Sequence, residues 1–99
     1  MRLFYLLLII CFSPKVTLVA EEEKRIVEGL SLNSSILGQE VKYSVVLPED
    51  YFKGKKKYPV VYLLHGLGDD ESSWLEYGRI AQISDKAADS KEIVPMIFI

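Results

Sequence analysis

The sequence predicts an α/β protein in which an antiparallel hairpin precedes a strand–helix–strand unit of a mostly parallel sheet. Three observations favour this class. Residues 41–47 alternate between apolar and polar side chains, as a half-buried strand does. Residues 58–64 form a continuous apolar run, which is typical of a central parallel strand. Residues 74–87 place apolar side chains at three- and four-residue steps, as one face of a helix does.

The start of the chain predicts an export signal. Arg2 supplies a positive charge, and residues 3–12 form an apolar run of about ten residues, within the range of a signal-peptide core. A membrane-spanning helix needs about 20 such residues. We therefore expect residues 1–20 to be a signal peptide cleaved near Ala20, although Leu18 is larger than usual for its position. The protein would then be secreted or periplasmic, with no membrane attachment. The alternatives are an uncleaved anchor and a buried helix of a cytosolic protein.

Composition narrows the class of protein further. The 99 residues leave room for one domain at most, and the 49% hydrophobic content is too high for a disordered chain. A net charge of −2 argues against a nucleic-acid partner, and Lys55, Lys56 and Lys57 fit a solvated loop. The single cysteine, Cys11, lies within the expected signal. Once the signal is removed, a disulfide, a thiolate metal site and a cysteine nucleophile are all excluded.

The remaining elements follow from local patterns. We expect strands over residues 25–32 and 41–47, a buried strand over 58–64, a glycine- and acid-rich loop over 65–71, a helix that begins at the Ser73/Glu76 capping box and fades near 88–90, and a further buried strand from 94. Parallel sheets need helices on both faces, and the sequence of this chain predicts only one helix. Residues 21–99 are therefore expected to be the truncated N-terminal part of a larger domain.

The segments that carry a family resemblance lie around the buried strand. Tyr43 to Pro48 is Tyr-Ser-Val-Val-Leu-Pro, Tyr58 to Gly66 is Tyr-Pro-Val-Val-Tyr-Leu-Leu-His-Gly, and Trp74 follows eight residues later. Together with the closing segment 93–99, they resemble the esterase D and feruloyl esterase branch of the α/β-hydrolases. That branch includes acetyl-xylan esterases, S-formylglutathione hydrolase and mycolyltransferases. The resemblance spans nearly all of residues 21–99 and implies a serine carboxylesterase that needs no cofactor.

The resemblance also implies a role for the loop after the buried strand. When an ester carbonyl is attacked, its oxygen becomes an anion that preorganised backbone N–H groups stabilise by about 3–4 kcal/mol each. In α/β-hydrolases one donor follows the nucleophile and the other comes from the loop after the third strand. The resemblance assigns the second donor to the N–H of Leu67, with His65, Gly66 and Gly68 shaping the loop. The alternative is a plain strand-to-helix turn whose glycines serve only geometry.

Other chemistry-bearing residues are explained without catalysis. His65 precedes the expected serine, so it does not fit the order serine, acid, histidine of this fold. Residues 69–71 lack the spaced oxygen ligands of a cation site, and negative charge before a helix is favourable by itself. Ser73 fits a helix cap better than a nucleophile. Trp74 is a candidate pocket residue together with Tyr77, although core packing is the favoured interpretation.

The catalytic serine, acid and histidine are all expected beyond Ile99, because the chain contains no G-x-S-x-G turn and no second histidine. The leading interpretation is an N-terminal fragment of an exported carboxylic-ester hydrolase, catalytically silent by itself. Its substrate would be a small-molecule or polysaccharide ester, such as feruloyl or acetyl xylan. The alternatives are an acyltransferase of the same fold, a non-catalytic exported binding module and a gene remnant. The sequence carries no signal for an oligomeric state.

Overall fold

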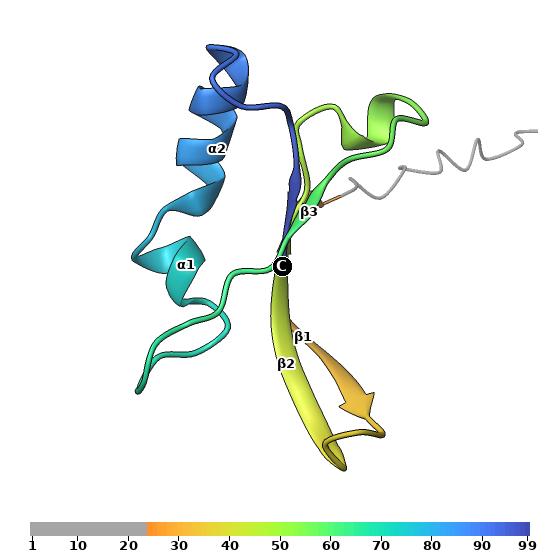
Figure 1. Cartoon of the computed structure of the whole chain (residues 1–99), viewed down its shortest axis with the longest axis vertical. Coiled ribbons are helices and arrows are strands. Elements are labelled where there is room, and N and C mark those ends of the chain that lie inside the picture. The colour runs from red at the N-terminus through yellow and green to blue at the C-terminus, as the bar shows by residue number, and fades with distance from the viewer. Residues whose placement is uncertain (1–23) are drawn as a thin grey trace, which may run out of the picture.

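The computed structural model describes residues 24–99, which form a four-stranded sheet in the order β1-β2-β4-β3 with the two α-helices packed on one face (Figure 1). The strands are β1 (Ile26–Ser34), β2 (Gln39–Val46), β3 (Val60–Val61) and β4 (Ile97–Phe98). A short 3-10 helix, η1 (Tyr51–Lys53), lies between β2 and β3. The predicted α/β class, with an antiparallel hairpin before a strand–helix–strand unit, is confirmed. The expected signal peptide lies outside the described residues, and its cleavage near Ala20 stays a prediction.

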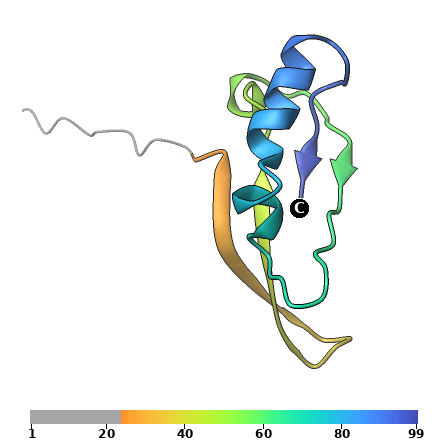
Figure 2. The same cartoon turned by 90° about the vertical axis from the view of Figure 1, so that its left-hand side faces the viewer.

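The predicted antiparallel hairpin is present, with Ile26 opposite Val46 at one end and Ser34 opposite Gln39 at the other. Its turn is closed by a hydrogen bond from the N–H of Gly38 to the carbonyl of Ser34, 2.8 Å long. Gly38 has a φ of 65°, a left-handed conformation that glycine adopts without a steric cost. The turn end of the hairpin extends away from both helices (Figures 1 and 2).

The predicted strand–helix–strand crossover is also present, since β3 pairs with β4 in parallel. The ladder extends past the two residues of β3, because Ile97 donates to the Pro59 carbonyl at 2.9 Å and Leu63 donates to the Ile99 carbonyl at 2.7 Å. Proline lacks an N–H, but here only its carbonyl is needed. Antiparallel pairing of β4 with β2, Phe98 opposite Val46, joins the crossover to the hairpin.

The predicted single helix is instead two helices, α1 (Ser73–Glu76) and α2 (Ile80–Asp89). Arg79 separates them with a φ of 50°, a left-handed conformation that a continuous helix cannot contain. The predicted capping box is wrong as well. Ser73 is the first helical residue, and its hydroxyl accepts a hydrogen bond from the N–H of Asp70 at 3.1 Å rather than capping the helix from outside.

The predicted apolar face of the helix is only partly right for α2, because Ile80 packs against the core but Ile83 does not. Ala81 and Ser84 are buried, whereas Ile83 is 58% exposed. The break at Arg79 resets the helical phase, so a face counted forward from Trp74 does not continue into α2. The periodicity therefore located the helical segment but placed Ile83 on the wrong side.

The core lies between the sheet and α2. Val46, Ala81 and Phe98 are buried, and partly buried apolar side chains pack around them: Val61, Leu63, Leu75, Ile80 and Met96. On β2 the buried residues are Ser44 and Val46, so at this end of the strand the face that contains Tyr43 and Val45 is the less buried one, contrary to the pattern of polarity. The helices lie on the side to which Ser44 and Val46 point.

The strand over residues 58–64 was predicted to be buried on both faces, and the described residues bury only one. Val61 and Leu63 contact the core, but Tyr62 is 70% and Leu64 is 86% exposed. Both α-helices of residues 24–99 lie on the opposite face of the sheet, which explains the difference (Figure 1). No helix among residues 24–99 has the length and apolar character needed to cross a membrane.

Candidate oxyanion loop

The candidate site is the loop of residues 65–71, which leaves the carboxyl end of β3 and leads into α1 (Figure 2). Ligands of open α/β sheets bind outside the carboxyl ends of the strands. The loop turns back at Gly66, whose carbonyl accepts a hydrogen bond from the N–H of Asp69 at 3.2 Å. Gly68 has a φ of 86°, a conformation that strongly favours glycine. The sequence identified this glycine, and the structure places it inside the turn.

His65 lies at the start of the loop with its ring engaged by the backbone. Its Nδ1 lies 2.9 Å from the carbonyl oxygen of Gly66. A carbonyl oxygen can only accept a hydrogen bond, so this contact requires a hydrogen on Nδ1. The contact holds the imidazole against the turn of its own loop. A role for His65 in shaping the loop remains a prediction.

The N–H of Leu67 is free to donate. It forms no hydrogen bond with any of the described residues, and the Leu67 side chain is fully exposed. A backbone N–H that secondary structure does not use is the feature that an oxyanion donor requires. The N–H of Leu67 is therefore available to bind an oxyanion, as the resemblance implied. Its role as an oxyanion donor remains a prediction.

Asp70 closes the far side of the loop. Its Oδ1 accepts hydrogen bonds from the hydroxyl of Ser72 at 2.6 Å and from the backbone N–H of Ser72 at 2.9 Å. The hydroxyl bond first, and then the N–H bond, lower the pKa of Asp70, because both stabilise the charged carboxylate. The sequence did not predict this role. An aspartate two residues before a serine at a helix start is the pattern of an Asx turn, which could have revealed it.

Trp74 faces the loop from α1. Its indole Nε1–H donates to the carbonyl of Leu64 at 3.1 Å. Core packing was the favoured interpretation for Trp74 and Tyr77, but in the described residues they are 43% and 80% exposed. Both line a pocket of about 300 Å³ that also contains loop residues; its lining is His65, Gly66, Asp69, Ser73, Trp74, Tyr77 and Gly78.

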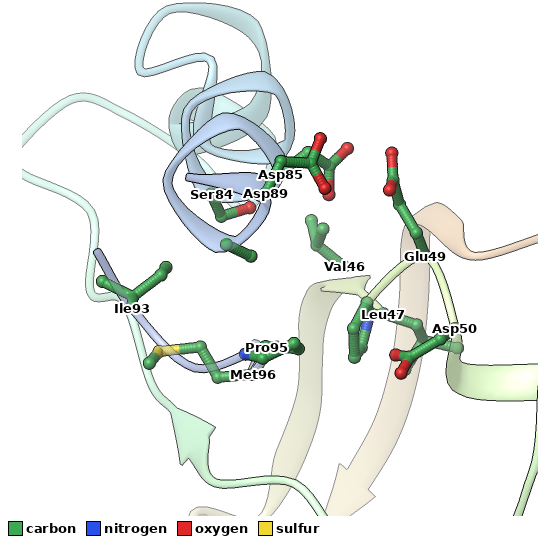
Figure 3. A pocket seen from close by; sticks show the side chains of 12 residues that line it. Val46, Leu47, Glu49, Asp50, Ser84, Asp85, Asp89, Ile93, Pro95 and Met96 are labelled. Carbon is green, nitrogen blue, oxygen red and sulfur yellow. The ribbon is translucent and has the colours of Figure 1, made fainter. Parts of the chain in front are cut away.

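A second pocket, of about 220 Å³, lies between the end of β2 and α2 and contains no residue of the loop (Figure 3). Glu49 points toward the helix that carries Asp85 and Asp89. Four acidic residues line this pocket, namely Glu49, Asp50, Asp85 and Asp89. Two of them already form ion pairs, because Asp85 binds Arg25 at 2.6 Å and Asp50 binds Lys56 at 3.0 Å. Within residues 24–99, no three histidine, cysteine or acidic side chains gather as metal ligands.

Comparison with known proteins gives consistent results. The sequence model of a family described as "Putative esterase" matches residues 34–99. The chain is 34% identical over 77 residues to an endo-1,4-beta-xylanase/feruloyl esterase of Xylanibacter ruminicola, a match that covers 74% of this chain. Among solved structures it is similar to a ferulic acid esterase with 35% identity and a TM-score of 0.69 over 74% of the chain. It is also similar to a CE1 ferulic acid esterase from the anaerobic fungus Anaeromyces mucronatus, with 30% identity and a TM-score of 0.61 over 80% of the chain.

These matches cover only part of the other proteins. The chain spans 11% of the Xylanibacter protein, and 28% and 30% of the two solved structures. The match begins within the hairpin and continues through β4, so it includes the whole candidate loop.

Proposed function

Since the chain belongs to this esterase family of α/β-hydrolase type, we propose that it is the N-terminal part of an exported serine carboxylesterase, with residues 21–99 forming the beginning of its catalytic domain. The observation that carries the proposal is the N–H of Leu67, which lies on the loop that follows β3 and donates to no acceptor within residues 24–99. This loop position is the one from which α/β-hydrolases supply an oxyanion donor.

The chemistry follows from the position of that donor. A serine oxygen attacks the ester carbonyl, the carbonyl oxygen takes up the negative charge, and the N–H of Leu67 donates to it. The other donor is the N–H of the residue after the nucleophile. We place that serine, together with its acid and histidine, beyond Ile99. We do not assign His65 to this triad, because it precedes the expected serine, whereas the order in this fold is serine, acid, histidine.

The exposed apolar face of β3 supports a larger domain. Val60, Tyr62 and Leu64 are 44%, 70% and 86% exposed and lie in a strand of the kind that parallel sheets bury on both sides. Large exposed apolar patches mark surfaces that another structure covers. In this proposal the rest of the hydrolase domain covers the face.

For the substrate, we propose esters of acylated plant polysaccharide, with feruloyl xylan first and acetyl xylan second. All three compared proteins carry feruloyl or ferulic acid esterase in their names, and one of those names also includes an endo-1,4-beta-xylanase. Export through the signal expected in residues 1–20 fits a substrate outside the cell. The oxyanion chemistry would serve an acyltransferase equally well, but no observation favours a sugar acceptor over water.

The test is to read the coding DNA beyond Ile99 and to express the complete reading frame without residues 1–20. We expect a G-x-S-x-G turn, a later acid and a later histidine, and release of ferulate from feruloylated xylan oligosaccharides. Labelling by a fluorophosphonate probe should require that serine, and the 99-residue chain alone should remain unlabelled. A complete frame without the serine turn, or a labelled 99-residue chain, would contradict the proposal.

A further inference from the structure

We propose that Trp74 is a positioning residue for the candidate oxyanion loop, acting through the hydrogen bond from its indole N–H to the carbonyl of Leu64. The inference rests on the proposed function, since it concerns the same loop. The bond is 3.1 Å long and joins residues ten positions apart. Leu64 is the last residue before the loop, and Trp74 lies just after it, on α1. The bond therefore ties together the two ends of the segment that carries Leu67.

The loop has few other attachments. Every residue from His65 to Asp70 is exposed, and the hydrogen bonds of this segment run within the loop or to the adjacent Ser72 and Ser73. These local bonds fix the shape of the loop but not its position relative to β3. The bond from Trp74 to Leu64 is the direct hydrogen bond that connects α1 back to the end of the strand.

Gly78 holds the indole in this position. A Cβ atom on Gly78 would lie 2.8 Å from the Cε3 atom of the Trp74 ring and 2.8 Å from the Trp74 carbonyl oxygen. Neither distance is sterically tolerable, so any other residue would displace the ring or the last turn of α1. Gly78 thus lies at the break between the two helices, and its lack of a side chain leaves space for the Trp74 ring against the backbone.

The position of the loop matters for catalysis more than for binding. An oxyanion donor acts at about 2.7–3.1 Å from the developing charge, and a displacement of about 1 Å can cost about 100-fold in rate. Because the donor interacts with the transition state, its displacement lowers kcat and kcat/KM together and leaves KM nearly unchanged. A general loss of folding would instead reduce the number of active molecules.

The experiment compares three variants of the full-length enzyme. Trp74→Phe keeps an aromatic ring and removes the N–H, and Gly78→Ala keeps the N–H and displaces the ring. The matched control is Tyr58→Phe, at the opposite end of β3. It also removes one hydrogen bond of an aromatic side chain, the 2.9 Å bond from the Tyr58 hydroxyl to Asp50. Active sites are counted by fluorophosphonate titration, so that kcat refers to folded enzyme. Hydrogen exchange of the peptide covering residues 65–71 reports the loop independently of activity.

We expect Trp74→Phe and Gly78→Ala to lower kcat per titrated site by about 10- to 100-fold, with KM changed less than about twofold. Exchange in residues 65–71 should be faster in both variants and unchanged in Tyr58→Phe. Wild-type kcat per site and wild-type exchange in Trp74→Phe would overturn the inference, as would a loss of titratable sites with unchanged exchange. Wild-type enzyme without esterase activity would instead refute the proposed function, and the exchange data would still decide whether Trp74 positions the loop.

Discussion

Arg25 and Asp85, sixty residues apart in the chain, are joined by two parallel hydrogen bonds, of 3.2 Å from Nη1 to Oδ1 and 2.6 Å from Nη2 to Oδ2. The Nη1 atom also donates to the carbonyl of Leu47 at 3.1 Å. One guanidinium thus connects the start of β1, the end of β2 and the middle of α2. A planar fork of donors suits this task, because it can bind a carboxylate with two bonds and a carbonyl with another.

We expect Arg25→Lys to lower the free energy of unfolding of the full-length protein by about 1–2 kcal/mol, since an ammonium cannot reproduce the paired geometry. The two side chains are only 28% and 20% exposed, so solvent screens the pair less than it screens a surface pair. The comparison is Lys56→Gln, which breaks the ion pair with Asp50 where the lysine side chain is 72% exposed. Chemical denaturation should show a clearly smaller effect for Lys56→Gln, and equal effects would contradict the assignment.

The lowered pKa of Asp70 gives a prediction about pH. A carboxyl whose pKa is lower in the folded state stabilises that state above its ordinary pKa of 3.8, and the contribution is lost as the pH falls through the folded pKa. The contribution of Asp70 to the order of the loop should therefore be lost only in acid, below about pH 4. Hydrogen exchange or NMR of residues 65–72 across this range measures the effect.

Removal of the Ser72 hydroxyl, which contributes most to the lowered pKa of Asp70, tests the cause of that shift by mutation. In Ser72→Ala the pKa of Asp70, followed by NMR of its side-chain carboxyl carbon, should rise toward 3.8 but not reach it, because the N–H of Ser72 remains as a donor. Ser73→Ala should raise it less, since the Ser73 hydroxyl lies 3.5 Å from Oδ1. A pKa of Asp70 that does not change in Ser72→Ala would contradict the hydrogen bond from the Ser72 hydroxyl to Asp70.

The sequence predicted what local patterns control. Alternation over residues 41–47 located the hairpin, and the apolar runs located β3 and β4 and their parallel pairing. It did not predict the break at Arg79, because three- and four-residue steps continue through that residue. Nor did it predict that Ser44 would be buried, since the buried face of a strand depends on where the helices pack.

In the candidate site too, the sequence predicted the local features and not the long-range contacts. The glycines and His65 were found from the motif, because they belong to one continuous segment. The contact of Trp74 with Leu64 was not found, because it depends on how α1 folds back on the end of β3. The pairing of Arg25 with Asp85 is a contact of the same kind and has no signature in residue spacing.

The end of α2 offers a stabilising substitution. Lys91 follows the helix with a φ of 60°, and its N–H donates to the carbonyl of Ala88 at 3.0 Å. A residue with a Cβ is strained in this left-handed conformation, which glycine commonly occupies at helix ends. Lys91→Gly should raise the free energy of unfolding by about 0.5–1 kcal/mol, after allowance for the greater flexibility of glycine in the unfolded chain.

The control for Lys91→Gly is Lys86→Gly, which introduces glycine inside α2 and should lower the free energy of unfolding by about 1 kcal/mol. Thermal or chemical unfolding of the full-length protein distinguishes the two. Destabilisation by both variants would show that the side chain of Lys91 makes a contribution that outweighs its backbone strain.

The N–H of Leu67 can be removed without a change in charge. Leu67→Pro deletes the donor, and Leu67 has no positive φ that would forbid proline. In the full-length enzyme we expect kcat to fall by about 100- to 1,000-fold with little change in KM, because the bond is made to the transition state. Leu67→Ala is the matched control, since it removes the exposed side chain and keeps the N–H. It should retain kcat within about threefold, because that side chain is fully exposed and packs on nothing among the described residues. Equal kcat values for Leu67→Pro and wild type would leave residues 65–71 as a plain strand-to-helix turn and move the second donor elsewhere.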